Sequence, residues 1–109
     1  MKTARHQEFF GGLIRLHILH HAVEGEFFGN WMLEELRRHG YRIGPGTLYP
    51  MLHVLERKGY LKSRTEGPGR RARRHYRATA KGRSALIAAR GKVEELFNEL
   101  WSDNEPTRG

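Results

Sequence analysis

The sequence contains no cysteine, and this absence excludes several kinds of site at once. Disulfides, zinc centres with thiolate ligands and cysteine nucleophiles all require that side chain. Long apolar runs are also missing, since no stretch approaches the roughly 20 apolar residues of a membrane-spanning helix. The N-terminal stretch MKTARHQEFF lacks the apolar region of a signal peptide. We therefore expect a soluble, cytoplasmic protein that contacts no membrane.

Acidic residues are scarce relative to basic ones. The 109 residues include 20 Lys and Arg but only 12 Asp and Glu, which gives a net charge of +8 and a pI near 10.4. A surface of this sign attracts polyanions and accelerates association with them. Nucleic acid is therefore the leading class of partner. A chain of this size is expected to form one domain that gains stability by pairing with a second copy.

Motifs of enzymatic chemistry are missing as well. The sequence has no G-x-x-x-x-G-K-[ST] phosphate loop and no nucleophile elbow. Glu94 and Glu95 are adjacent, so they point to different faces of a helix and form no carboxylate pair. We expect a protein that is not an enzyme and needs no cofactor.

Two helical patterns occupy the first forty residues. The first begins at Thr3 or at His6 and ends at Val23, and its broad apolar surface indicates burial on more than one side. The segment EGEFFGN is interpreted as a turn. The second helix is GNWMLEELRRHG, which Gly40 ends.

A third helix lies within IGPGTLYPMLHVLERKGYL, which contains both Pro45 and Pro50. Pro45 suits a helix start, where its missing N–H is not needed. If Thr47 is the N-cap, Pro50 falls in the first turn, where an N–H has no acceptor within the helix. A start at Gly44 would instead place Pro50 inside the helix and distort it locally. Both starts are open at this point.

The outer side of the third helix is a candidate surface for nucleic acid. Leucines recur at i, i+4 and i+7, so they face the core: Leu48, Leu52 and Leu55. Polar side chains remain on the other sides, near the positive end of the helix, where phosphates bind well. An ordinary helix also has a polar outer face, so this pattern alone does not distinguish a DNA-binding helix from a merely solvated one. The candidate residues are Thr47, Tyr49, Pro50, His53 and Arg57.

Alternation with a period of two replaces the helical pattern after Gly59. The runs YLKSRTE and HYRAT flank GPGRRARR, which predicts a β-hairpin with an exposed basic tip, or wing. Arginine has donors that match phosphate geometry and enters narrow minor grooves favourably. A solvated loop or a basic targeting run is the alternative, but a hairpin directly behind three helices favours DNA. The wing arginines are Arg70, Arg71, Arg73 and Arg74.

The last helix is predicted over residues 80–102, with Thr79 as its N-cap, and residues 103–109 are expected to be a flexible tail. Apolar residues spaced three and four apart form the seam of a pairing helix. Two aromatic residues lie beside this seam, four positions apart. The predicted dimer interface comprises Leu86, Ala89, Val93, Leu96, Phe97, Leu100 and Trp101.

Two of these motifs together point to a family. The segments GTLYPMLHVLERKGYL and GRRARRHYRATAKGR, with RLHILHHAVEGEFFGNWMLEELRRHGY before them, closely resemble the PadR family of bacterial transcriptional regulators, in its short subfamily. The likeness covers nearly the whole chain apart from both tails. It implies a mainly α (α+β) winged helix-turn-helix: three helices with a two-stranded wing in residues 1–79, and a long C-terminal dimerisation helix that packs against the partner's first helix.

The resemblance also implies a function. Family members of this kind repress transcription as homodimers at palindromic operators and are released by a small effector. By the resemblance, the recognition helix enters the major groove, and the arginines at 70 to 74 belong to the wing. Some short relatives stack flat ligands on aromatic side chains of the pairing helix, which implies an effector site at Phe97 and Trp101. The implied recognition residues are Pro45, Gly46, Thr47, Tyr49 and Pro50.

Histidines near the end of the first helix form a candidate metal site. His17 and His21 are spaced i, i+4, so they could share a face and bind a transition metal. His20 lies between them. Histidines that merely pack on a dimer helix are the alternative interpretation. A further ligand could come from Glu24, Glu26, His6 or His39, which the sequence does not place.

The sequence therefore predicts a sequence-specific, double-stranded-DNA-binding transcriptional regulator, a repressor that acts as a homodimer. Two other functions stay open. One is a sensor protein whose histidine cluster or interface aromatics are the primary site, with a metal or small molecule as effector and an incidental basic surface. The other is a dimeric adaptor that binds another protein through its helices.

Overall fold

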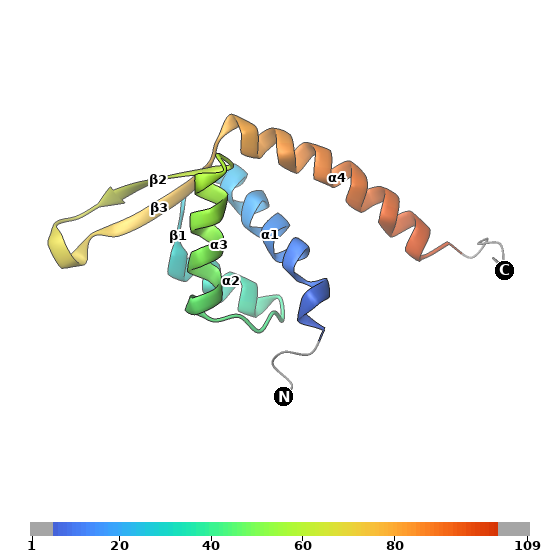
Figure 1. Cartoon of the computed structure of the whole chain (residues 1–109), viewed down its shortest axis with the longest axis horizontal. Helices are drawn as coiled ribbons and strands as arrows, with labels where there is room; N and C mark the ends of the chain where they lie inside the picture. Colours follow the sequence, from blue (N-terminus) through green and yellow to red (C-terminus); the bar gives the residue numbers. More distant parts are fainter. Residues whose placement is uncertain (1–5, 103–109) are drawn as a thin grey trace.

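Helices make up most of the chain, and a small sheet projects from them (Figure 1). The computed structural model describes residues 6–102, apart from the side chain of Arg71. The wing and the last helix extend to opposite sides of the helical core (Figure 1). This arrangement confirms the predicted mainly α winged helix-turn-helix. The elements are η2 (Gln7–Phe9), α1 (Gly11–Glu24), β1 (Phe27–Phe28), α2 (Gly29–Arg38), α3 (Pro45–Arg57), β2 (Leu61–Glu66), η3 (Gly69–Arg71), β3 (Arg73–Ala78) and α4 (Ala80–Leu100).

The core forms where α1, α2 and α3 meet the sheet. The three leucines of α3 that were expected to face inward are buried there, with Leu48 and Leu52 fully inaccessible. Burial of each such side chain contributes about 1.5–3 kcal/mol. The fully buried side chains are Ile18, Met32, Leu36, Leu48, Leu52 and Leu61.

The sheet has three strands rather than two, in the order β1-β3-β2. The interpretation of EGEFFGN as a turn was therefore wrong. Phe27 pairs with Tyr76 and Phe28 with His75, so β1 extends the wing on the side away from β2. Two residues are too short to show alternation, and the partner strand lies far along the chain. Only the tertiary contact identifies this strand.

The first helix is interrupted at its start. A short η2 comes first, and α1 begins only at Gly11, so the single helix predicted from Thr3 or His6 was wrong in its beginning. Gly11 and Gly12 begin α1, and glycine weakens a helix by about 1 kcal/mol per residue, so this first turn is intrinsically weak. Thr3 and the predicted tail at 103–109 lie outside the described residues.

Helix α3 begins at Pro45, with Gly44 as its N-cap, so the alternative start at Gly44 is correct and Thr47 is not the cap. The amides of Thr47 and Leu48 both donate to the carbonyl oxygen of Gly44, at 3.1 and 3.0 Å, so the first turn starts three residues before Thr47. Pro50 therefore lies inside the helix. Its ring leaves the carbonyl of Gly46 without the usual helical donor, but Gly46 is exposed, so water can take that place.

Helix α4 is joined to the rest of the fold at its first turn. As predicted, Thr79 is the N-cap, and its Oγ1 accepts from the amide of Gly82 at 3.0 Å. The amide of Thr79 donates to the carbonyl oxygen of Tyr60 at 3.1 Å. A Cβ at position 82 would lie 2.2 Å from that same oxygen. Only glycine lets α4 approach the backbone between α3 and β2 this closely.

None of the helices in the described part of the chain is long and apolar enough to cross a membrane.

We predict that Gly82→Ala lowers the free energy of unfolding by about 2–3 kcal/mol, because the added methyl group collides with a backbone oxygen that cannot rotate away. Urea denaturation at one protein concentration measures the change. Gly91→Ala is the matched control: it lies on the same helix with open space around it, and alanine should raise stability by up to about 1 kcal/mol. Equal effects of the two substitutions would contradict this account.

Candidate nucleic-acid interface

The outer side of α3 is open to solvent along most of its length. Tyr49 is half-buried, and the other predicted recognition residues are exposed. Arg57 lies in the last turn of the helix, where a cation is favourable. The exposed residues on this side are Pro45, Gly46, Thr47, Pro50, His53 and Arg57.

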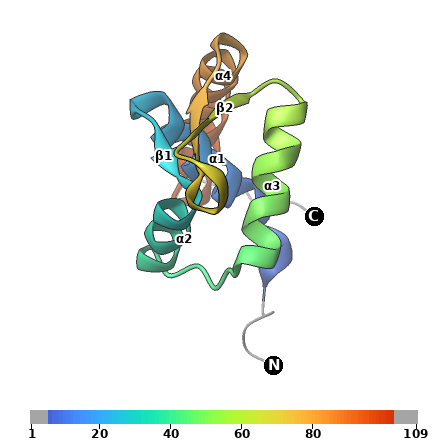
Figure 2. The same cartoon turned by 90° about the vertical axis from the view of Figure 1, so that its left-hand side faces the viewer.

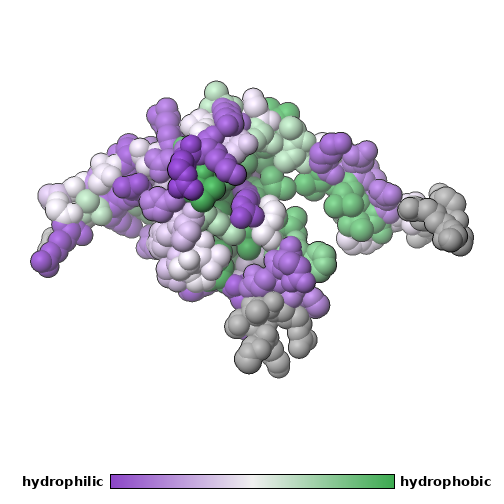
Figure 3. All heavy atoms as spheres, viewed as in Figure 1, coloured by the Kyte–Doolittle hydropathy of each residue, from purple (hydrophilic) through white to green (hydrophobic). Residues whose placement is uncertain are grey.

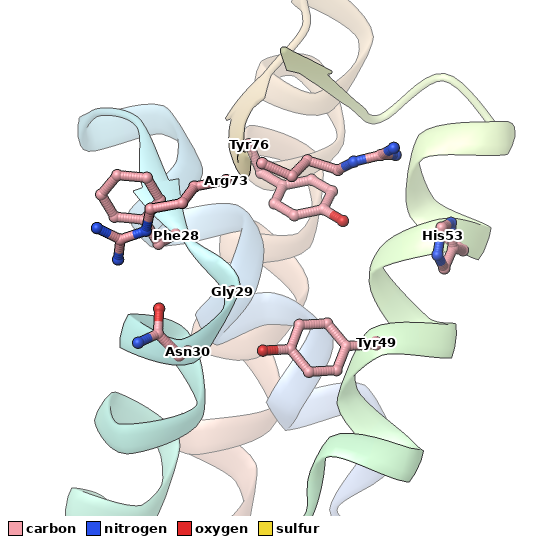
Figure 4. A pocket seen from close by; sticks show the side chains of 8 residues that line it. Phe28, Gly29, Asn30, Tyr49, His53, Arg73 and Tyr76 are labelled. Atoms are coloured by element: carbon pink, nitrogen blue, oxygen red, sulfur yellow. The ribbon is translucent and has the colours of Figure 1, made fainter. Parts of the chain in front are cut away.

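A groove of about 430 Å³ runs between α3, the start of α2 and the wing (Figure 4). Tyr49 reaches across it from α3 toward Asn30, and His53 lies one turn further along α3 (Figure 4). The ring of Tyr49 occupies the space that a Cβ at Gly29 would need, with only 2.4 Å between them. Two arginines and no acidic residue are among the lining residues, which are Phe28, Gly29, Asn30, Tyr49, His53, Arg73, Arg74 and Tyr76.

The four wing arginines divide into two pairs. Arg70 and Arg71 belong to η3 at the tip, whereas Arg73 and Arg74 lie on β3. The guanidinium of Arg73 lies 3.7 Å from the centre of the Phe28 ring. A cation on an aromatic face is held in place without losing its charge. The wing thus presents cations both at its tip and beside the groove.

Salt bridges fix the wing against β1. Arg64 on β2 donates to both carboxylate oxygens of Glu26, at 3.0 and 2.9 Å. His75 is buried between Phe28, at 4.2 Å between ring centres, and the carboxylates of Glu26 and Glu66. Sequence analysis missed Arg64 and Glu26 as supports of the wing, because they are 38 residues apart and no local pattern links them.

A histidine cluster is formed by residues of α1 and the end of α2. The imidazoles of His17 and His39 are 4.6 Å apart, and that of His21 lies 3.3 Å from the carboxylate of Glu35. Burial lowers the pKa of His17, and the neighbouring histidines lower it further, so this ring is neutral near pH 7. Burial raises the pKa of Glu35, but hydrogen bonds from Arg38 and His39 outweigh it, so its pKa is lowered and the carboxylate is ionised.

The cluster brings together more than the sequence indicated. His39, one of the further ligands that the sequence left open, joins His17 and His21, the two residues singled out by spacing. Glu35 was missed entirely, since a lone glutamate in an amphipathic helix is usually exposed, yet here it is 6% exposed. His20 points toward Glu24, at 3.3 Å, on the solvent side of α1.

Helix α4 carries a row of exposed apolar side chains over its second half (Figure 3). Phe97 and Trp101 stack with ring centres 5.0 Å apart, and both remain more than half exposed. Leu86 differs from the rest of the predicted interface because it packs, half-buried, against the core of its own chain. Ala89 is half-buried. The exposed members of the row are Val93, Leu96, Phe97, Leu100 and Trp101.

We predict that Arg64→Gln destabilises the protein at pH 7 and that this penalty shrinks as the pH falls. The hydrogen bond from Arg64 lowers the pKa of Glu26, so the stabilisation is present above the ordinary pKa of the carboxyl, 4.5, and is lost as the pH falls through its lower folded value. Urea denaturation at pH 7 and at about pH 3 measures both states. Lys62→Gln, an exposed change on the same strand, serves as the control; a penalty for Arg64→Gln that is independent of pH would contradict the assignment.

Comparisons with known proteins agree with this architecture. The family model described as the transcriptional regulator PadR-like family matches residues 18–88. The transcriptional regulator Rv3488 of Mycobacterium tuberculosis (strain ATCC 25618 / H37Rv) is 50% identical over 103 residues, which cover 94% of this chain and 96% of that protein.

Solved structures show the same fold. A PadR family transcriptional regulator from Eggerthella lenta DSM 2243 superposes with a TM-score of 0.77 at 28% identity, covering 86% of this chain and 83% of that one. A PadR-like transcription factor from Bacteroides fragilis gives a TM-score of 0.75 at 21% identity, covering 86% and 92%. With α3, the wing and the long last helix all in place, this chain belongs to the PadR-like family of transcriptional regulators.

Proposed function

We propose that this regulator is a homodimeric, sequence-specific repressor that acts in the cytoplasm and binds a palindromic DNA operator. The observation that carries the proposal is the arrangement of α3 and the wing. The exposed side of α3 and the cations of β3 border the same groove. Viewed from the wing side, α2, α3 and the wing stand in front of α4 (Figure 2). One surface therefore combines a protruding helix with a basic hairpin, as DNA-reading winged helices require.

The outer side of α3 is suited to the major groove, which is about 12 Å wide and admits a helix. Thr47 and His53 have polar atoms for base edges or phosphates, and Tyr49 reaches across the groove beside the wing. The wing arginines lie on the flank of this surface, where they meet the phosphate backbone or a narrow minor groove. Base contacts from α3 would then specify the sequence, and wing contacts would supply affinity.

The apolar row on α4 supports the homodimer. Leu96, Leu100 and Trp101 are 54%, 63% and 69% exposed in the single chain. Exposed apolar residues in a continuous row mark interaction sites. More apolar side chains are exposed on η2 and α1, including Phe9 and Leu13. Pairing through α4 against the partner's α1 would cover both sets and present two recognition helices about 34 Å apart.

A flat aromatic effector would fit the same interface. Phe97 and Trp101 offer parallel, exposed ring faces near the end of α4. Aromatic rings bind other rings through offset stacking. A ligand held between two such pairs would change how the α4 helices cross, and with it the spacing of the recognition helices. This is how an effector bound at the interface would release the operator.

We predict that Arg70→Gln/Arg73→Gln weakens binding to every DNA sequence and flattens its salt dependence. Each phosphate contact contributes roughly 0.9 to the slope of log K against log salt, so two lost contacts should reduce it by roughly 1.8 per protomer. Fluorescence anisotropy with the operator, first selected from random duplexes, measures K at several salt concentrations. The control Arg83→Gln/Arg90→Gln removes the same charge from α4. An unchanged slope for the wing variant would refute the phosphate role.

We predict that Leu96→Glu converts the homodimer to a folded monomer. The substitution places a charge in the proposed α4 interface, while the side chain is 54% exposed in the single chain and contributes little to its core. Asn98→Glu adds the same charge two residues further, on the opposite face of the helix, and should remain dimeric. Sedimentation velocity gives the molecular mass of both. A dimeric Leu96→Glu variant would rule out this interface.

A further inference from the structure

Three imidazoles from two helices converge beside a buried carboxylate. His17 and His21 lie on consecutive turns of α1, and His39 caps the end of α2. One ring nitrogen from each of the three lies within 4.8 Å of the other two. The residues come from two helices that the core already holds against each other, so their proximity is built into the fold.

The buried carboxylate is that of Glu35, which contacts the rings of His21 and His39. Its carboxylate lies 3.3 Å from Nε2 of His21 and 3.1 Å from Nε2 of His39, and it also pairs with Arg38. The Glu35 side chain is 7% exposed, so its negative charge is almost removed from water. A carboxylate that contacts metal-binding imidazoles orients the rings and increases their basicity.

We propose that His17, His21 and His39 bind a divalent transition-metal ion of the zinc class, with Glu35 as the carboxylate that positions the rings of His21 and His39. Imidazole nitrogens favour Zn²⁺, Ni²⁺, Co²⁺ and Cu²⁺ over Mg²⁺ and Ca²⁺, which favour oxygen ligands. A tetrahedral ion with Zn–N bonds of about 2.1 Å holds its ligand atoms about 3.4 Å apart. The ring nitrogens of the three histidines already lie within 4.8 Å of one another, so small side-chain rotations bring them to this spacing, and the side chain of His39 is partly exposed.

A second group, formed by His20, His21 and Glu24, is the competing assignment. All of its members lie on α1, and the side chains of His20 and Glu24 are 54% and 61% exposed. The first group has ligands from two helices and the buried carboxylate of Glu35 behind them. These features reduce the cost of ordering the ligands, so the geometry favours His17, His21 and His39.

The position of this site gives an ion a structural effect. His39 begins the connection between α2 and the recognition helix, in which the amide of Tyr41 donates to the carbonyl of Leu36 at 3.1 Å. The ring of Tyr41 also lies 5.4 Å from that of His17. A bound ion would therefore link α1 to the segment that leads into α3 and would stabilise the folded state.

Calorimetric titration of tag-free protein with Zn²⁺, without DNA, tests the proposal. We expect about one ion per chain for the parent, and an affinity at least tenfold lower for both His39→Gln and His17→Gln. His20→Gln, which removes a neighbouring imidazole from the competing group, should match the parent. Addition of Zn²⁺ should raise the melting temperature of the parent and of His20→Gln but not that of His39→Gln.

Three outcomes would overturn the proposal: no binding by the parent, equal affinity of the parent and both triad variants, or loss of binding in His20→Gln alone. The last would assign the ion to the competing group. His39 is about half exposed, so its substitution spares the core, and His17→Gln repeats the test from the other helix. Because the titration contains no DNA, its result is independent of the proposed repressor function.

Discussion

The contact between the backbone of Tyr60 and the first turn of α4 is the constraint on which the rest of the structure depends. Four elements meet there: the end of α3, the start of β2, the end of β3 and the start of α4. Thr79 bonds to the carbonyls of both Gly59 and Tyr60, and Gly82 allows the close approach. This junction sets the angle between α3 and the wing, and also the direction in which α4 leaves the core.

Charge is distributed over the fold in two distinct ways. On the side of α3 and the wing, cations predominate: Arg73 lies on the face of Phe28, which leaves its charge in place, and Arg74 pairs with Glu56 at 3.9 Å. On α2, by contrast, Glu35 carries a buried carboxylate that contacts the guanidinium of Arg38 and the imidazoles of His21 and His39. The first arrangement leaves charge available for a polyanion. The second neutralises a buried charge within the protein, beside the histidines that we propose as the ligands of a metal ion.

Local patterns predicted the helices with regular periodicity and the cap of α4 correctly. Leu48, Leu52 and Leu55 face inward as their spacing indicated, and Thr79 caps α4. The errors have physical causes. The strand β1 is too short for alternation to appear. A rule that keeps proline out of a helix interior favours a start at Thr47, but α3 begins at Pro45 and tolerates Pro50 inside it, where the exposed carbonyl of Gly46 can bind water.

The sequence by itself determined the class of the protein and the kinds of residue available to its surface. Composition, periodicity and the arginine-rich hairpin are local properties, and they led to a basic winged helix-turn-helix; the resemblance of two sequence motifs to known regulators added the PadR family. Tertiary structure alone decided which distant residues meet: Arg64 with Glu26, Tyr49 with Gly29, and His39 with His17. Such contacts depend on how helices and strands pack against one another, and the pattern of residues that are neighbours in sequence does not predict that packing. The physical reason is that packing of the whole core, rather than local propensity, sets these distances.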